Sequence, residues 1–197
     1  FSSVTIDITY PAENGAAAIR VAGVEVEVAQ NTFVDSANPG GGAVGAEFSG
    51  AVVLVNNAFV GSEGGAVLRQ DGAVLDGDYD LYSGNDVDFV NANPGEHDVH
   101  APPGFVRHVA GDCTSDLRPA SGSALVDAGD PARLDDDGTR SDIGAFGGAG
   151  ASSLLDVDGD GVIDGDRDPY DAGVGPLVPE IPADGIDWKR PVEVLDD

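Results

Sequence analysis

The fold is decided by two stretches that align without a gap: residues 26–34, Val26-Glu27-Val28-Ala29-Gln30-Asn31-Thr32-Phe33-Val34, and residues 52–60, Val52-Val53-Leu54-Val55-Asn56-Asn57-Ala58-Phe59-Val60. A weaker third copy, Leu75 to Ser83, places Asp80 under Asn57 and Tyr82 under Phe59. An amide or acid followed two positions later by an aromatic residue therefore recurs at one place in each unit. Self-similarity of this kind is typical of repeat architectures.

A second short strand accompanies each copy, at residues 18–21, 42–45 and 65–68. Each unit then contains a strand, an Asn turn, an aromatic residue, a Gly-rich loop and another strand. Units of about 22 to 28 residues with Asn at a fixed corner predict an all-β, single-stranded right-handed parallel β-helix, whose coils stack at about 4.8 Å and whose Asn side chains form a ladder. An antiparallel sandwich is the alternative, but it does not require Asn and Phe to recur together.

The first copy also shows the period of a strand with one buried face. Val24, Val26 and Val28 alternate with Glu25 and Glu27. Because successive strand side chains point to opposite faces, the three valines are expected in the core and the two glutamates in solvent.

Composition narrows the possible partners. The chain has 197 residues, 41% of them hydrophobic, which is enough for one core. Its net charge of −27 disfavours binding to nucleic acid or to anionic membranes and favours cations. Calcium binding and adaptation to high salt both explain such acidity. No apolar run is long enough for a membrane helix, and the single cysteine, Cys113, is expected to be an inert, partly buried residue.

The C-terminal half resembles a known group. The stretch from Asp116 to Asp130, DLRPASGSALVDAGD, followed by the stretch from Asp135 to Gly148, DDDGTRSDIGAFGG, is similar to the end of bacterial and archaeal right-handed parallel β-helix surface proteins. Residues 78–82 and 103–106 match two further landmarks of that group. Asp80 stands where the group has Asn, and Ala101-Pro102-Pro103-Gly104 stands where it has Asp-Pro. The resemblance implies β-helix rungs over residues 1–110 and a C-terminal end or cap over 111–150, and it is weak for function because this fold carries many activities.

An Asp-rich stretch, expected as a separate calcium repeat over residues 151–174, follows the cap. Its acidic residues alternate with Gly and Val in a spacing that wraps oxygen ligands around one Ca²⁺, and it is similar to thrombospondin type 3 and dockerin-like repeats. Arg167 stands where an EF-hand has its bidentate Glu, which excludes an intact EF-hand. The expected calcium ligands are Asp156, Asp158, Asp160, Val162 through its carbonyl, Asp164, Asp166, Asp168 and Asp171.

A second acidic run, Asp135-Asp136-Asp137-Gly138, is interpreted as a solvated turn in preference to a second cation site. Nearby, Arg140 and Asp142 are expected to pair with neighbouring acids or backbone to close the last coil. No catalytic role is expected for either residue.

An enzymatic alternative remains, since parallel β-helices often cleave acidic polysaccharides with a calcium ion and a basic residue. A surface this acidic repels a polyuronate substrate, and none of the candidates lies in a recognisable lyase motif. Carboxylates in one groove would instead suit an inverting glycoside hydrolase. The candidates are Asp76, Asp78 and Asp80 as ligands, Asp86 and Asp88 as additional carboxylates, and Arg69, Arg107, His97, His100 or His108 as base.

The last segment, residues 175–197, is rich in proline and is expected to be an extended arm that presents Trp188 to a groove on this chain or on another copy. Open β-helix ends and this arm together predict a homo-oligomer or head-to-tail fibre. We therefore expect an extracellular or cell-surface structural or adhesive module that uses Ca²⁺, with a polysaccharide among its partners. A carbohydrate-active enzyme and a passive calcium-stabilised spacer are the alternatives.

Overall fold

The computed structural model describes residues 18–37, 41–112 and 114–151, and these residues form an all-β structure without an α-helix. The predicted calcium ligands at 156–171 and the arm at 175–197 lie outside the described residues. Short strands account for all of the regular structure. They are β1 Ile19–Ala22, β2 Glu25–Ala29, β3 Thr32–Val34, β4 Val44–Glu47, β5 Ala51–Val55, β6 Ala58–Val60, β7 Val67–Arg69, β8 Val74–Asp78, β9 Leu81–Ser83, β10 Phe89–Val90, β11 Val99–His100, β12 Phe105–Arg107 and β13 Asp116–Pro119.

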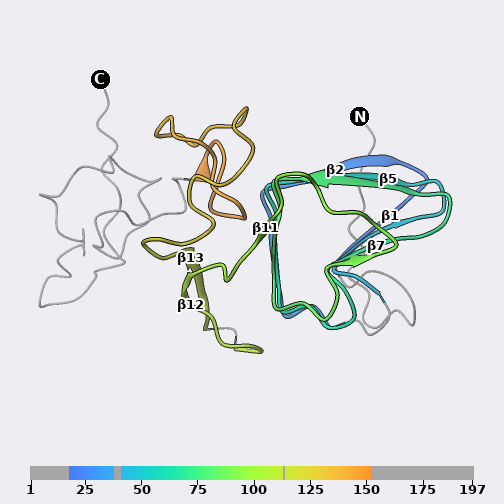
Figure 1. Ribbon diagram of the computed structural model, residues 1–197, viewed down its shortest axis with the longest axis horizontal. Helices are drawn as coiled ribbons and strands as arrows, with labels where there is room; N and C mark the ends of the chain where they lie inside the picture. The colour runs from blue at the N-terminus through green and yellow to red at the C-terminus, as the bar shows by residue number, and fades with distance from the viewer. Residues whose placement is uncertain (1–17, 38–40, 113, 152–197) are drawn as a thin grey trace, which may run out of the picture.

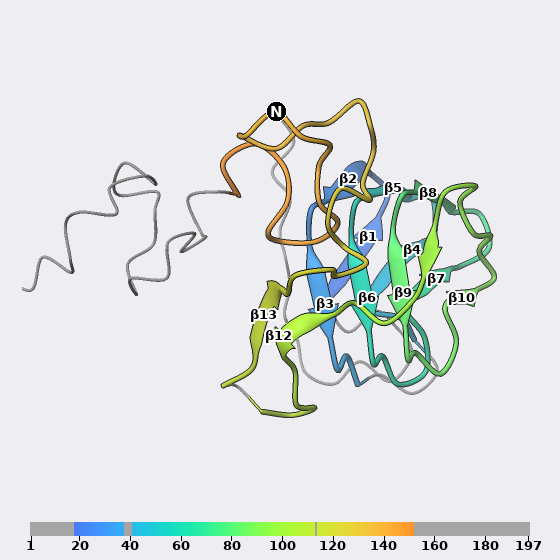
Figure 2. The same cartoon turned by 60° about the vertical axis from the view of Figure 1, so that its left-hand side comes forward.

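Three parallel sheets surround one core. Strands β1-β4-β7-β10 form the first sheet, β2-β5-β8 the second and β11-β9-β6-β3 the third. Consecutive strands thus belong to different sheets, and each coil adds one strand to each sheet. Three coils are followed by β10 and β11, which begin a fourth. Figure 1 looks nearly along the stack, so that β2 and β5 overlap, whereas Figure 2 shows the coils side by side. The predicted parallel β-solenoid is confirmed.

The pairing register follows the sequence repeat. Val26 pairs with Val52 and Phe33 with Phe59, as the first alignment predicts. The third copy is also in register, because Phe59 pairs with Tyr82. A one-residue slip would move every side chain to the opposite face, so the agreement places Phe33, Phe59 and Tyr82 on one common face.

In the first sheet, Ile19 pairs with Val44 and Val44 pairs with Val67. One detail of the first coil differs from the sequence prediction. Val24 is 46% exposed, whereas Val28 is buried as expected. Val24 precedes β2 and lies at the corner next to Gly23, which has a positive φ of 70°. The alternation therefore begins only after the chain has turned into the strand.

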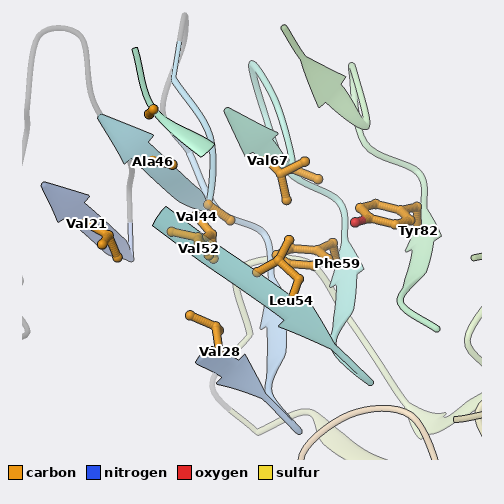
Figure 3. Packing of buried hydrophobic residues seen from close by; sticks show 12 residues of the cluster. Val21, Val28, Val44, Ala46, Val52, Leu54, Phe59, Val67 and Tyr82 are labelled. Atoms are coloured by element: carbon orange, nitrogen blue, oxygen red, sulfur yellow. The ribbon is translucent and has the colours of Figure 1, made fainter. Parts of the chain in front are cut away.

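Valine and aromatic side chains from all three sheets fill the core (Figure 3). The rings of Phe33 and Phe59 stack with centroids 5.0 Å apart, and those of Phe59 and Tyr82 are 5.2 Å apart, with both pairs 9° from parallel. His100 continues the column, at 5.6 Å from Tyr82. Stacking of like residues from coil to coil is the physical reason for the aromatic repeat in the sequence.

Residues 101–151 form a segment without a repeat that packs beside the coils (Figures 1 and 2). It begins with β12 and β13, which form an antiparallel pair. Further on, Leu125 and Ile143 cover Ala58 and Val60 on the outer face of the third sheet. Both faces of β6 are consequently buried.

Candidate functional site

A groove of about 540 Å³ lies across the outer face of the sheet β2-β5-β8. The register places Glu27, Val53 and Asp76 at the same outward position of three successive coils, and these side chains form the floor. One wall is the loop at 94–96, and the other is the turn at 130–133 from the C-terminal segment. The lining consists of Glu27, Val53, Leu54, Val55, Asp76, Gly77, Asp78, Tyr79, Pro94, Gly95, Glu96, Asp130 and Arg133.

The groove is strongly acidic, with five carboxylates and one guanidinium in its lining. The Nη2 of Arg133 donates to Glu27 Oε2 at 2.9 Å, and its Nε lies 3.8 Å from Asp130 Oδ2. Arg133 therefore ties the C-terminal segment to the first coil. Neither of these two contacts engages Asp76 or Glu96.

Asp78 anchors the wall at 94–97. It accepts hydrogen bonds from His97 N at 2.7 Å and Tyr79 N at 3.1 Å, and its Oδ2 lies 2.8 Å from His97 Nδ1. Partial burial acts to raise the pKa of Asp78, but the bonds from His97 and Tyr79 outweigh it and hold the pKa below its ordinary value. The Asp78 hydrogen bond in turn raises the pKa of His97. Asp78 is thus suited to anchoring the loop as an ionised acceptor and poorly suited to donating a proton.

The wall approaches β8 so closely that only glycine fits at position 95. A Cβ at Gly95 would lie 2.5 Å from the Gly77 carbonyl oxygen and 2.7 Å from Asp78 Cα. Beside it, the rings of Tyr79 and His97 stack at 4.6 Å, and the Arg140 guanidinium lies 5.5 Å from the Tyr79 centroid. Tyr79 therefore contacts both the wall and the C-terminal segment, and it braces the corner of the groove.

Asp80, a predicted groove carboxylate, instead lies inside the solenoid. It is fully buried and continues a ladder of side chains formed by Asn31 and Asn57. Burial raises its pKa to about 8, against the lowering effect of hydrogen bonds from Asn57. A substrate in the groove would not reach this carboxyl group.

The other candidates from the sequence are dispersed. Arg69 donates to Asn91 O at 2.7 Å, Arg107 donates to Thr114, and His108 Nε2 lies 3.1 Å from Asp35 Oδ2. Asp86 accepts from Gly64 N, and His100 Nδ1 lies 3.2 Å from Asp88 Oδ2. None of these residues lines the groove. The structure therefore brings together only Asp76 and Asp78 in the groove, with His97 behind its wall.

The acidic run at 135–137 binds backbone amides. Asp135 accepts from Asp142 N at 3.0 Å and from Gly148 N, Asp136 accepts from Gly150 N at 2.9 Å, and Asp137 accepts from Thr139 N at 2.8 Å. These carboxylates organise the loop itself. Within the described ranges, no three His, Cys, Asp or Glu residues are grouped as metal ligands.

Arg140 and Asp142 pair with backbone, as predicted. Arg140 Nη2 donates to Ala128 O at 3.0 Å and its Nε donates to Gly129 O, while Asp142 Oδ1 accepts from Asp127 N at 2.7 Å. These contacts lie within the C-terminal segment and hold its turns together.

Four charged residues of the lining were not among the site residues predicted from sequence, namely Glu27, Glu96, Asp130 and Arg133. The repeat could have indicated Glu27. The alignment of the first and second copies places Glu27 beside Val53, and the alignment of the second and third copies places Val53 beside Asp76. Glu96, Asp130 and Arg133 come from segments without a repeat, and no spacing in the sequence relates them to the sheet.

No known protein family, curated protein or solved structure matches this chain. Function is therefore inferred from the solenoid and its groove. In the part of the chain that the structure describes, no helix is long and apolar enough to cross a membrane.

Proposed function

We propose that the chain is a structural or adhesive β-solenoid module of an extracellular surface protein, and that the acidic groove is its adhesive site. The groove carries this proposal. It is an open concave surface built on three stacked strands, and stacked strands hold their side chains at a regular spacing of about 4.8 Å. A repeating ligand such as a glycan chain suits such a surface.

The chemistry of the lining favours a neutral or amine-bearing glycan. Asp76 and Glu96 can accept hydrogen bonds from hydroxyl or ammonium groups, and Val53 and Pro94 offer apolar contact to the carbon faces of a sugar. An acidic polysaccharide would be repelled by the excess of carboxylates.

Binding is favoured over catalysis by the condition of the carboxylates. Asp78 is held as an ionised acceptor by its hydrogen bonds, and Asp80 is buried in the ladder. Hydrolysis with inversion requires one carboxylic acid and one carboxylate on opposite sides of the scissile bond. The carboxyl groups left for the acid and base roles are Asp76 on the floor of the groove and Glu96 in its wall. An activity assay tests whether this pair is catalytic.

Binding of the full chain to immobilised chitosan, chitin and polygalacturonate tests the adhesive role. We expect the Asp76→Asn/Glu96→Gln double variant to lose about tenfold or more in affinity for chitosan or chitin, which corresponds to about 1.4 kcal/mol. Glu25→Gln is the matched control, because Glu25 is an exposed glutamate of β2 outside the groove lining. Equal binding by the double variant and the wild type would contradict the assignment, and depolymerisation of the glycan would favour the enzyme.

Calcium is the second part of the proposal, supported by the spacing of carboxylates in the stretch 156–171. Carboxylates that converge in one loop repel each other until a divalent ion neutralises them. EDTA should therefore lower the melting temperature and increase proteolysis within 151–174, and Asp158→Ala should have the same effect. Identical digestion with and without calcium would exclude the site.

Self-association through the solenoid ends and the arm is the third part, supported by the Pro-rich sequence of 175–197 with Trp188. Deletion of residues 184–197 should reduce the particle size measured by light scattering. An unchanged particle size would rule out assembly through the arm.

A further inference from the structure

The side-chain ladder changes its chemistry along the solenoid. Its rungs are Asn31, Asn57, Asp80 and Asp98, one from each coil. Asn31 N donates to Asn57 Oδ1 at 3.1 Å, Asn57 N donates to Asp80 Oδ1 at 2.6 Å, and Asp80 N donates to Asp98 Oδ1 at 3.1 Å. The geometry is the same at each step, but two permanently neutral amides are followed by two groups that can ionise.

The second oxygen of Asp80 occupies the place of an amide nitrogen. In the coil before, Asn57 Nδ2 donates to Val28 O at 2.8 Å and to Val55 O at 3.3 Å. The register makes Leu54 O and Asp78 O the equivalent acceptors for residue 80. Consistent with this, a Cβ at Gly77 would lie 3.0 Å from Asp80 Oδ2 and 3.5 Å from Leu54 O.

This oxygen needs a proton to fit its surroundings. Among the described residues, Asp80 Oδ2 is buried and has no hydrogen-bond partner. A carboxylate oxygen facing backbone carbonyl oxygens is repelled by them, whereas a protonated oxygen can donate to them as Asn57 does. Burial, together with the charges of Asp98 and Asp78, raises the pKa of Asp80 in the direction this geometry requires. The titratable groups around it are Asp78, Tyr82, Asp88, His97, Asp98 and His100.

The same ladder holds the wall of the groove. Asp98 Oδ2 accepts from Gly95 N at 2.7 Å, and Asp78 Oδ1 accepts from His97 N at 2.7 Å. Asp80 lies close to both anchoring carboxylates, since its backbone N–H donates to Asp98 and the charges of Asp98 and Asp78 both act on its carboxyl group. An ionised Asp80 would place a third negative charge beside them.

We propose that a proton held on Asp80 keeps the loop 94–98 closed on strand β8, so that the acidic groove retains this wall only while Asp80 is neutral. The direction follows from the linkage between proton binding and stability. Because the pKa of Asp80 is raised in the closed form, the bound proton stabilises that form fully below about pH 4, and this stabilisation is lost as the pH rises through about 8. Because opening releases the proton over that range, the opening equilibrium rises by up to about tenfold per pH unit.

Amide hydrogen exchange of the full chain tests the proposal. After correction for the intrinsic rate, the protection of the Gly95 and His97 amides should fall between pH 6 and pH 8 by about tenfold or more in the wild type relative to Asp80→Asn. His97 and its hydrogen bond with Asp78 are present in both proteins, so the difference between the two profiles isolates Asp80. Asp76→Asn, which alters a groove carboxylate outside the ladder, should follow the wild type.

Superimposed profiles of the wild type and Asp80→Asn would overturn the proposal. The inference rests on the proposed function only for what the groove binds, because exchange is measured without a ligand. A pH-dependent wall with no glycan binding would reject the adhesive role alone, whereas glycan binding with a pH-independent wall would reject this inference alone.

Discussion

The solenoid at residues 18–100 and the segment at 101–151 are packed against each other but are held together by different interactions. In the solenoid, successive coils repeat the same contacts, such as the Phe33–Phe59 stack at 5.0 Å and the Asn31–Asn57 ladder. In the C-terminal segment, carboxylates accept from backbone amides, as Asp135 does from Asp142 N and Asp137 from Thr139 N.

This difference indicates which kind of change should destabilise each region. Contacts that repeat between coils are apolar or neutral over the first two coils, so their stability should respond to side-chain volume. Contacts in the C-terminal segment depend on carboxyl groups that accept hydrogen bonds from backbone amides, so the stability of this segment should respond to pH. Its apolar contribution comes mainly from Leu125 and Ile143, which pack on the solenoid. Each region can therefore be perturbed by a change that leaves the other region largely intact.

The largest effect is expected from Phe59→Ala. Phe59 is fully buried and stacks on both Phe33 and Tyr82, so truncation leaves a cavity in the middle of the column. We expect a loss of about 3 to 5 kcal/mol in the free energy of unfolding, measured by chemical denaturation. A loss below about 1 kcal/mol would show that Phe59 is not in the column.

A smaller and more local effect is expected from Ile143→Ala. Ile143 is buried against the outer face of β6, and removal of its side chain exposes Ala58 and Val60. We expect a loss of about 2 to 4 kcal/mol for the docking of residues 120–151, seen as increased amide exchange there. Equal deprotection of the β2 and β5 amides would contradict the separation of the two regions.

The smallest effect is expected from Asp142→Asn and should depend on pH. Burial, with repulsion from Asp135, Asp127 and Asp137, raises the pKa of Asp142 to about 6, despite its bond from Asp127 N. The stability contributed by its protonated form is therefore present below about pH 4 and is lost as the pH rises through 6.

Asn keeps the acceptor for Asp127 N and cannot ionise. The variant should therefore stabilise the C-terminal segment above pH 6 by on the order of 1 kcal/mol after allowance for solvent screening. Thermal unfolding at pH 4 and pH 7.5 measures this difference. A variant that is less stable than the wild type at pH 7.5 would contradict the assigned cause.

The two regions also differ in how far the sequence predicts them. The repeat predicts the register of the second and third sheets, because a parallel stack brings equivalent residues such as Asn57 and Asp80 to the same corner in each coil. Val24 was wrongly expected in the core, since the valine alternation continues past the point where the strand begins.

The groove could be predicted only in part. Asp76 and Asp78 were candidates because this stretch is rich in carboxylates, whereas Asp80 was expected beside them and is buried. Strand alternation would have placed all three on one face, but Asp80 follows the corner at Tyr79, which has a φ of 60° and reverses the direction of the next side chain. Arg133 reaches the groove through tertiary packing, for which the sequence has no periodic signal.

The central claim is that the coils stack in parallel and in register, and disulfide trapping tests it most directly. Val53 and Asp76 are outward-facing register partners, so Cα atoms about 4.8 Å apart are expected there, within the range a disulfide can bridge. In a Cys113→Ser background, Val53→Cys/Asp76→Cys should oxidise rapidly to one intramolecular disulfide. Val53→Cys/Val74→Cys, two positions out of register on the same face, should not. Faster oxidation of the second pair, or none of the first, would contradict the parallel register on which the solenoid, its ladder and its groove depend.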